Sequence, residues 1–300
     1  MISIIQAENA LKNIYLDVIS NQLNCNIDPF ISKVEKTTRD VWGKEILTPC
    51  ALYSENGVEY NNIKVELANI YLTIELSDKA IRAAQNSTGA FINLLNNEIE
   101  SMLKEGKYRI SNAIYTQDTK PEYLPLEAPF SPIEFISLSD IFNIEQKSIY
   151  GLDREEWGLM PEIKHIKEFN PTIIEEFIDN VNPSIDFLIC TPSMKRSIHQ
   201  YFLDHKQNVE RKDFGSIGSY MEFNDNISII PYKNMTDNEI WLVNSSDFTL
   251  NQLCDWLWLS DENDRILKQN INKPVYTANL VKYANLICHN VKGQIKIIID

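Results

Sequence analysis

The sequence predicts an α+β fold in which an α/β module is inserted into a domain built from a long helix and a sheet. Apolar and polar residues alternate between 46 and 76, which indicates a long β-hairpin and a further strand. Helical spacing between 78 and 106 indicates a helix of about 45 Å, at about 1.5 Å per residue. Strand and helix patterns then alternate between 170 and 245, and strands return after residue 256. Because these late strands need partners, we expect residues 256–300 to pair with strands near 64–76, beside the long helix.

The amino-acid composition limits the classes of function that the protein can have. The chain has 300 residues and a net charge of -14, from 28 Lys+Arg against 42 Asp+Glu. Proteins that grip DNA cluster their basic residues, and no dense basic run occurs here, so we expect DNA to be contained without being gripped. No secretory signal and no run of about 20 apolar residues is present, so we expect no membrane association. The five cysteines are widely spaced, which is typical of reduced thiols in the cytoplasm.

The N-terminal segment, residues 1–45, is predicted to be an arm. Residues 4–23 have the spacing of an amphipathic helix, and residues 24–44 are irregular, with Pro29 and Gly43. One helix cannot bury its own apolar stripe. It must therefore dock either on another part of this chain or on a neighbouring subunit.

Residues 46–70 are predicted to form an extended hairpin. Asn56-Gly57 is a strong turn signal, because both residues tolerate a positive φ. The flanking strands have many polar positions, which favours a ribbon exposed on one face. A long hairpin is marginally stable alone, so we expect it to project and to lie on a surface that can belong to another subunit.

Helix-start signals support the remaining elements. Ser77 can cap the long helix, and Asp78 suits its first turn. Asn170-Pro171 supplies a cap and a first-turn proline for a helix to about residue 181. The apolar run 185–190 indicates a buried strand, and Thr191-Pro192 begins another helix. These signals predict a compact α/β module.

Patterns that would indicate catalysis or metal binding are incomplete. Residues 215–219 resemble the GxSxG elbow, but the spacing is wrong. The histidines lack the paired spacing of metal ligands. The acidic turn at Asp261 has Ile266 and Asn272 where a calcium loop needs Gly and Glu. We therefore predict no enzyme activity, no cofactor and no metal.

Four motifs follow one another in the C-terminal half. They are Ser148-Ile149-Tyr150-Gly151-Leu152-Asp153-Arg154 with Trp157, then Asp186–Pro192 with Arg196, then Glu239–Asn244, and finally Tyr276–Leu280 with Tyr283–Leu286 and Gly293–Ile295. In this order, after a β ribbon and a long helix, they resemble the major capsid proteins of tailed bacteriophages. The resemblance covers roughly residues 40–300, and the ordered set carries it rather than any single motif.

The resemblance implies the Hong Kong phage-type capsid fold, with a long spine helix, an extended β-hairpin loop and an inserted α/β axial domain. It implies a peripheral domain at 71–154 and 251–300 and an axial domain at 155–250. Two departures stand out. Asn290-Val291-Lys292 replaces the usual Pro-Arg pair, and the N-terminal region is too short for a fused scaffolding domain.

The function implied is self-assembly, through pentamers and hexamers, into an icosahedral shell that encloses double-stranded DNA. The protein would be part of the virion, would assemble in the host cytoplasm, and would work with a portal and a separate scaffolding protein. The residues we expect to matter for assembly are Asn56, Gly57, Gly151, Arg154, Trp157 and Trp241. Trp157 and Trp241 are expected to be buried anchors rather than platforms for base stacking.

Two alternatives remain open at this stage. The first is an encapsulin-type nanocompartment, which has the same fold but encloses enzyme cargo, so the particle's contents would distinguish it. The second is an unrelated soluble α/β binding protein or enzyme with a β arm. That alternative requires a small particle and a concave polar pocket.

Overall fold

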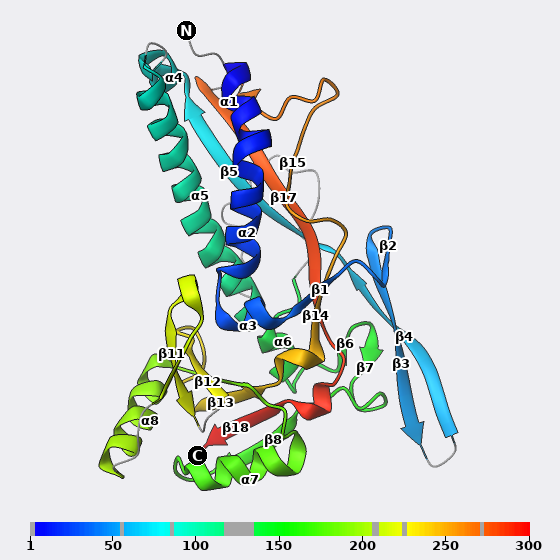
Figure 1. The fold of residues 1–300 in the computed structure, drawn as a ribbon. Helices are drawn as coiled ribbons and strands as arrows, with labels where there is room; N and C mark the ends of the chain where they lie inside the picture. The colour runs from blue at the N-terminus through cyan, green and yellow to red at the C-terminus, as the bar shows by residue number, and fades with distance from the viewer. Residues whose placement is uncertain are drawn as a thin grey trace.

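A computed structural model describes residues 4–54, 57–84, 87–116, 135–205, 210–223, 227–270 and 273–300. Long helices run beside a pair of long strands in one domain, and a second domain with its own sheet and helices lies at their end (Figure 1). A β-ribbon projects away from both domains (Figure 1). This arrangement confirms the predicted α+β class.

The peripheral sheet is organised around one long strand, β17. Its members are β1 (Glu35–Thr37), β5 (Ala68–Ser77), β14 (Phe248–Gln252), β15 (Leu257–Trp258), β16 (Lys268–Gln269) and β17 (Val275–Cys288). β17 pairs antiparallel with β5, from Val275 opposite Ser77 to Ala284 opposite Ala68. The expected pairing of a late strand with the early sheet is therefore confirmed for β17.

The spine is divided into α4 (Asp78–Ala84) and α5 (Thr88–Tyr115). The sequence predicted one helix at 78–106. Instead α5 has its own start, where the Ser87 hydroxyl accepts a hydrogen bond from the Ala90 amide at 3.3 Å. α5 also continues past 106, because Ile110, Ile114 and Tyr115 extend its buried face. Gly106 lets α5 approach β5 closely, since a Cβ there would lie 2.7 Å from Leu72 Cδ1.

The N-terminal helices lie along the spine (Figure 1). They are α1 (Ile4–Ala10), the π-helical segment η1 (Leu11–Tyr15), α2 (Leu16–Cys25) and α3 (Pro29–Lys33). Tyr15 Oη donates to Asn96 Oδ1 of α5 at 2.8 Å, and Trp258 Nε1 donates to the Leu11 carbonyl at 3.2 Å. Leu11 and Ile19 of the apolar stripe are buried in the core of their own chain, whereas Ile14 and Val18 are 65% and 54% exposed. The helices therefore dock on their own chain with part of the stripe, and contact of the exposed part with a neighbouring subunit stays a prediction.

The axial sheet has the strand order β10-β11-β12-β9-β13-β18-β8. Its strands are β8 (Glu162–Ile166), β9 (Phe187–Cys190), β10 (Arg211–Asp213), β11 (Ser219–Phe223), β12 (Ile227–Pro231), β13 (Glu239–Val243) and β18 (Ile295–Ile299). Helices α7 (Pro171–Val181) and α8 (Pro192–Asp204) cover one face. Leu188 and Cys190 of β9 face these helices, while Phe187 and Ile189 face the core of the peripheral domain. Burial on both faces explains the apolar run of β9.

β18 corrects the predicted domain division. We expected residues 256–300 to join the peripheral sheet, but β18 pairs antiparallel with β13 and parallel with β8 in the axial sheet. Ile295 and Ile297 are fully buried and fill the core beneath α7 and α8. The chain therefore returns to the axial domain after β17, because that core needs this strand.

The ribbon consists of β2 (Val41–Trp42), β3 (Glu45–Ser54) and β4 (Gly57–Glu66). The β3–β4 ladder runs from Glu45 opposite Glu66 to Ser54 opposite Gly57. Gly57 is thus part of the ladder rather than a central turn residue, and the predicted partner Asn56 lies outside the described residues.

Short elements complete the described chain. They are α6 (Leu138–Phe142), β6 (Ser148–Ile149), β7 (Leu152–Asp153), η2 (Gly215–Ile217), η4 (Ser245–Asp247) and η5 (Val291–Gly293). The predicted caps are present: Asn170 Oδ1 accepts from the Thr172 amide, and the Thr191 hydroxyl accepts from the Met194 amide. No helix in the described ranges has the length and apolar character needed to span a membrane.

Candidate assembly surfaces

The β3–β4 ribbon has a buried base and an exposed outer half. Ile46, Ile63 and Val65 at the base are buried in the core. Farther out, 42% of Val58 and 75% of Tyr60 are exposed. Apolar side chains on a projecting ribbon gain free energy only when another surface covers them. The outer half of the ribbon is therefore a candidate intersubunit contact.

The tight turn between β6 and β7 holds the base of the ribbon. Tyr150 and Gly151 have φ values of 58° and 77°, as a type I′ turn requires. The Tyr150 carbonyl accepts from the Lys64 amide at 3.0 Å, and Tyr150 Oη accepts from the Cys288 amide at 2.9 Å. Tyr150 thus connects the ribbon to β17. Gly151 was a predicted site residue, and a Cβ there would lie 3.4 Å from the Lys64 carbonyl oxygen.

Arg154 lies inside its own chain, with 1% of its surface exposed. Its guanidinium donates to the carbonyl oxygens of Ile141 at 3.1 Å and Leu159 at 3.2 Å, and also to that of Asp140. Desolvation by burial lowers the pKa of Arg154, against the opposing influence of Tyr150 and Asp140. Arg154 therefore joins the end of α6 to the segment that follows β7, and its side chain is not available at the surface of the chain.

The two tryptophans differ in burial. Trp241 is 5% exposed and stacks on Phe142, with ring centroids 4.9 Å apart and an angle of 19° between the planes. Its Nε1 donates to Glu239 Oε2 at 3.2 Å. Trp157 is half-buried at the edge of the same core. Trp241 therefore offers no free ring face to a base and is the buried anchor that we expected.

Lys282 was missed at the sequence level. It lies in the middle of β17, and 2% of its side chain is exposed. Its Nζ donates to Asn24 Oδ1 at 2.7 Å and to Asp255 Oδ1 at 3.2 Å, so it joins the end of α2 to the sheet. Burial lowers its pKa, and Asp255 opposes that effect. The sequence signal for a buried lysine was its position among the apolar residues of β17.

Two patterns weighed in the sequence, a metal site and the GxSxG-like loop, can be compared with the described part of the chain. No group of three His, Cys, Asp or Glu there is arranged to hold a metal ion. In the GxSxG-like loop, Ser216 Oγ donates to Asn26 Oδ1 at 2.7 Å, in an exposed position. That hydroxyl has an amide as its partner, whereas nucleophilic activation requires a base.

Solved structures share this arrangement. The cyanophage A-1(L) capsid chain superposes with a TM-score of 0.60 at 10% identity, over 93% of this chain and 91% of that one. The SrpI encapsulin complex of Synechococcus elongatus PCC 7942 gives 0.57 at 12% identity, over 91% and 89%. The capsid of Myoviridae phage XM1 gives 0.52 at 7% identity, over 89% and 90%. No protein-family model and no curated protein sequence matches the chain. The chain has the Hong Kong phage-type capsid fold.

Proposed function

We propose that this protein is the major capsid protein of a tailed phage or prophage and self-assembles into an icosahedral shell. The observation that carries the proposal is the projecting β3–β4 ribbon, on a capsid fold, with Val58 and Tyr60 exposed on its outer half. A ribbon that is apolar where its own chain leaves it uncovered is suited to lie on a neighbouring copy.

Weak contacts are sufficient for such a shell. Many identical copies each contribute a modest interface, and closure multiplies the effect. Closed symmetry also covers sheet edges that a single chain leaves open, such as the outer edge of β10. The axial domains would meet in pentamers and hexamers, as the resemblance implies.

The net charge of the chain indicates how the shell would interact with DNA. With a net charge of -14, the shell wall would enclose double-stranded DNA without binding it specifically. Packaging would then depend on a portal, and assembly on a separate scaffolding protein. The protein would form part of the virion after assembly in the host cytoplasm.

The second candidate function is an encapsulin-type compartment. The similarity to the SrpI encapsulin complex, with a TM-score of 0.57, favours it to the same extent as the capsid similarities favour the first. Both functions require the same shell. Nuclease-protected DNA in particles isolated from the native source would support the capsid. A protein cargo without DNA would support the compartment and overturn the phage assignment.

The assembly proposal is tested by negative-stain electron microscopy of the purified chain and of a variant lacking residues 50–62. We expect closed particles from the intact chain and a folded, unassembled variant with the same far-UV circular dichroism. The double substitution Val58→Thr with Tyr60→Ser should also impair assembly. Ile92→Thr is the matched control, because Ile92 is an exposed apolar residue outside the ribbon, at 44%. Normal shells from the deletion would refute the role of the ribbon.

A further inference from the structure

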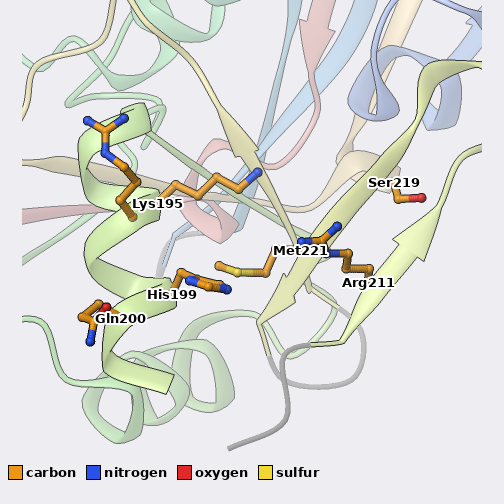
Figure 2. A pocket seen from close by; sticks show the side chains of 7 residues that line it. Lys195, His199, Gln200, Arg211, Ser219 and Met221 are labelled. Atoms are coloured by element: carbon orange, nitrogen blue, oxygen red, sulfur yellow. The ribbon is translucent and has the colours of Figure 1, made fainter. Parts of the chain in front are cut away.

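A cavity of about 460 Å³ lies in the axial domain between α8 and the β10–β11 hairpin. In Figure 2, Lys195 and His199 extend from the helix toward the strands that carry Arg211, Ser219 and Met221. Ser219, the last residue of the GxSxG-like loop, lines this cavity, whereas none of the candidate assembly residues does. Its lining therefore does not overlap with the candidate assembly residues.

Local geometry explains why the polar side chains converge. Lys195 and His199 are separated by four residues, so they lie on the same face of α8, and Arg196 and Gln200 lie beside them. Arg211 stands directly opposite Met221 in the β10–β11 ladder, which places both on the face toward the helix. Lys212 points to the opposite face and pairs there with Glu222 at 3.7 Å.

The charge of the cavity is one-sided. Lys195, Arg196 and Arg211 all line it, and no carboxylate does among the residues that the structure describes. None of these cations forms an ion pair with a described residue. Asp213, on the same face of β10, accepts a hydrogen bond from the Gly215 amide at 3.0 Å. Like charges that share a concave site repel one another, and a bound anion removes that cost.

We propose that this cavity is a binding site for a small oligophosphate, such as tripolyphosphate or a nucleoside triphosphate. Two guanidinium groups supply forked donors that match phosphate oxygens, and Lys195 adds a compact positive charge. His199, Gln200 and Ser219 provide further polar groups around them. A volume of about 460 Å³ exceeds that of one phosphate and lies in the range of small-ligand sites.

The acidity of the whole chain favours a short ligand over a nucleic-acid strand. A strand would continue beyond the cavity over a protein whose net charge is -14 and would be repelled there. A short oligophosphate keeps its charge within the cationic cavity. The experiment must therefore distinguish binding of a short oligophosphate from binding of a nucleic-acid strand.

Isothermal titration calorimetry of the full-length chain with sodium tripolyphosphate, at constant ionic strength, tests the proposal. We expect one site per chain. Arg196→Gln combined with Arg211→Gln should weaken binding by at least about tenfold, because a charged hydrogen bond contributes about 1.5–3 kcal/mol. Lys167→Gln combined with Lys233→Gln is the matched control. It removes the same charge from exposed positions of the same domain, outside the cavity, and should change affinity less than about twofold.

Two competing ligands separate the alternatives. Citrate, a carboxylate trianion, should bind more weakly than tripolyphosphate, because it carries less negative charge and offers fewer acceptor oxygens to the three cations. A ten-residue oligothymidylate should also bind more weakly. Absence of tripolyphosphate binding, or equal losses in the two double variants, would overturn the site. Equal citrate binding would overturn phosphate recognition, and tighter oligothymidylate binding through the same arginines would overturn the small-ligand assignment. Unchanged melting temperatures confirm that the variants fold.

Discussion

Arg154→Met removes the donors that join the end of α6 to the segment after β7. The carbonyl oxygens of Ile141, Leu159 and Asp140 then lose their charged partner. Each carbonyl left unpaired in a buried position costs about 1–3 kcal/mol. Removing the guanidinium also relieves the cost of burying a charge, which offsets part of that loss. The expected decrease in the free energy of unfolding is therefore about 3–5 kcal/mol, at the upper end of single substitutions.

The assay is urea denaturation of the unassembled chain, followed by tryptophan fluorescence. Arg154→Lys should lose less, because an ammonium still donates hydrogen bonds, although it lacks the planar fork. Arg265→Met is the matched control, since Arg265 is exposed, and it should change stability by less than about 0.5 kcal/mol. A loss below about 1 kcal/mol for Arg154→Met would show that water replaces the guanidinium, and the account of this connection would be wrong.

Three further predictions concern pH, a buried lysine and DNA. Burial raises the pKa of Asp28 from 3.8 to about 6. Because the pKa is higher in the folded chain, the protonated carboxyl stabilises the fold below about pH 4, and this contribution is lost as the pH rises to about 6. The free energy of unfolding should fall by on the order of 2–3 kcal/mol over this range, and Asp28→Asn should abolish that fall in pH-dependent denaturation curves. Lys282→Met should cost about 1–2 kcal/mol in urea denaturation, a modest value because its partner Asp255 is 52% exposed and water can solvate it. A loss above about 4 kcal/mol would contradict this reasoning. In a mobility-shift titration at physiological salt the subunit should bind DNA weakly and without sequence preference, and submicromolar binding that falls steeply with salt would show that the charge pattern has been misinterpreted.

Local signals in the sequence were sufficient for many individual elements, although not for the division of the spine into α4 and α5. Asn170 and Thr191 cap the helices that follow them, because a cap depends only on residues within the next turn. The alternation around residues 46–76 identified the ribbon and β5 for the same reason, since a strand's pattern is visible along its own length. The order of these elements was also enough for the resemblance to capsid proteins.

Tertiary structure decided which elements are partners. The sequence of β18 is apolar and does not show which sheet it joins. Its pairing with β13 on one side and β8 on the other places it in the axial sheet. The N-terminal stripe was compatible with either its own chain or a neighbour, and the fold buries Leu11 and Ile19 while it leaves Ile14 and Val18 exposed. Periodicity identifies a buried face without naming the surface that buries it, because that surface is distant in sequence.

The same limit applies to single charged residues. Arg154 was expected to matter for assembly and is buried in its own chain. Lys195 was not singled out, and Arg196 entered only as part of the motif that begins at Asp186, yet both line a cationic cavity. Arg211, which completes that cavity, comes from a hairpin that follows the helix in sequence and lies opposite it in space. The sequence alone determined the composition, the elements and their order. Whether each charge is buried, paired or free depends on which distant segments the fold brings beside it, because electrostatic interactions act through space rather than along the chain.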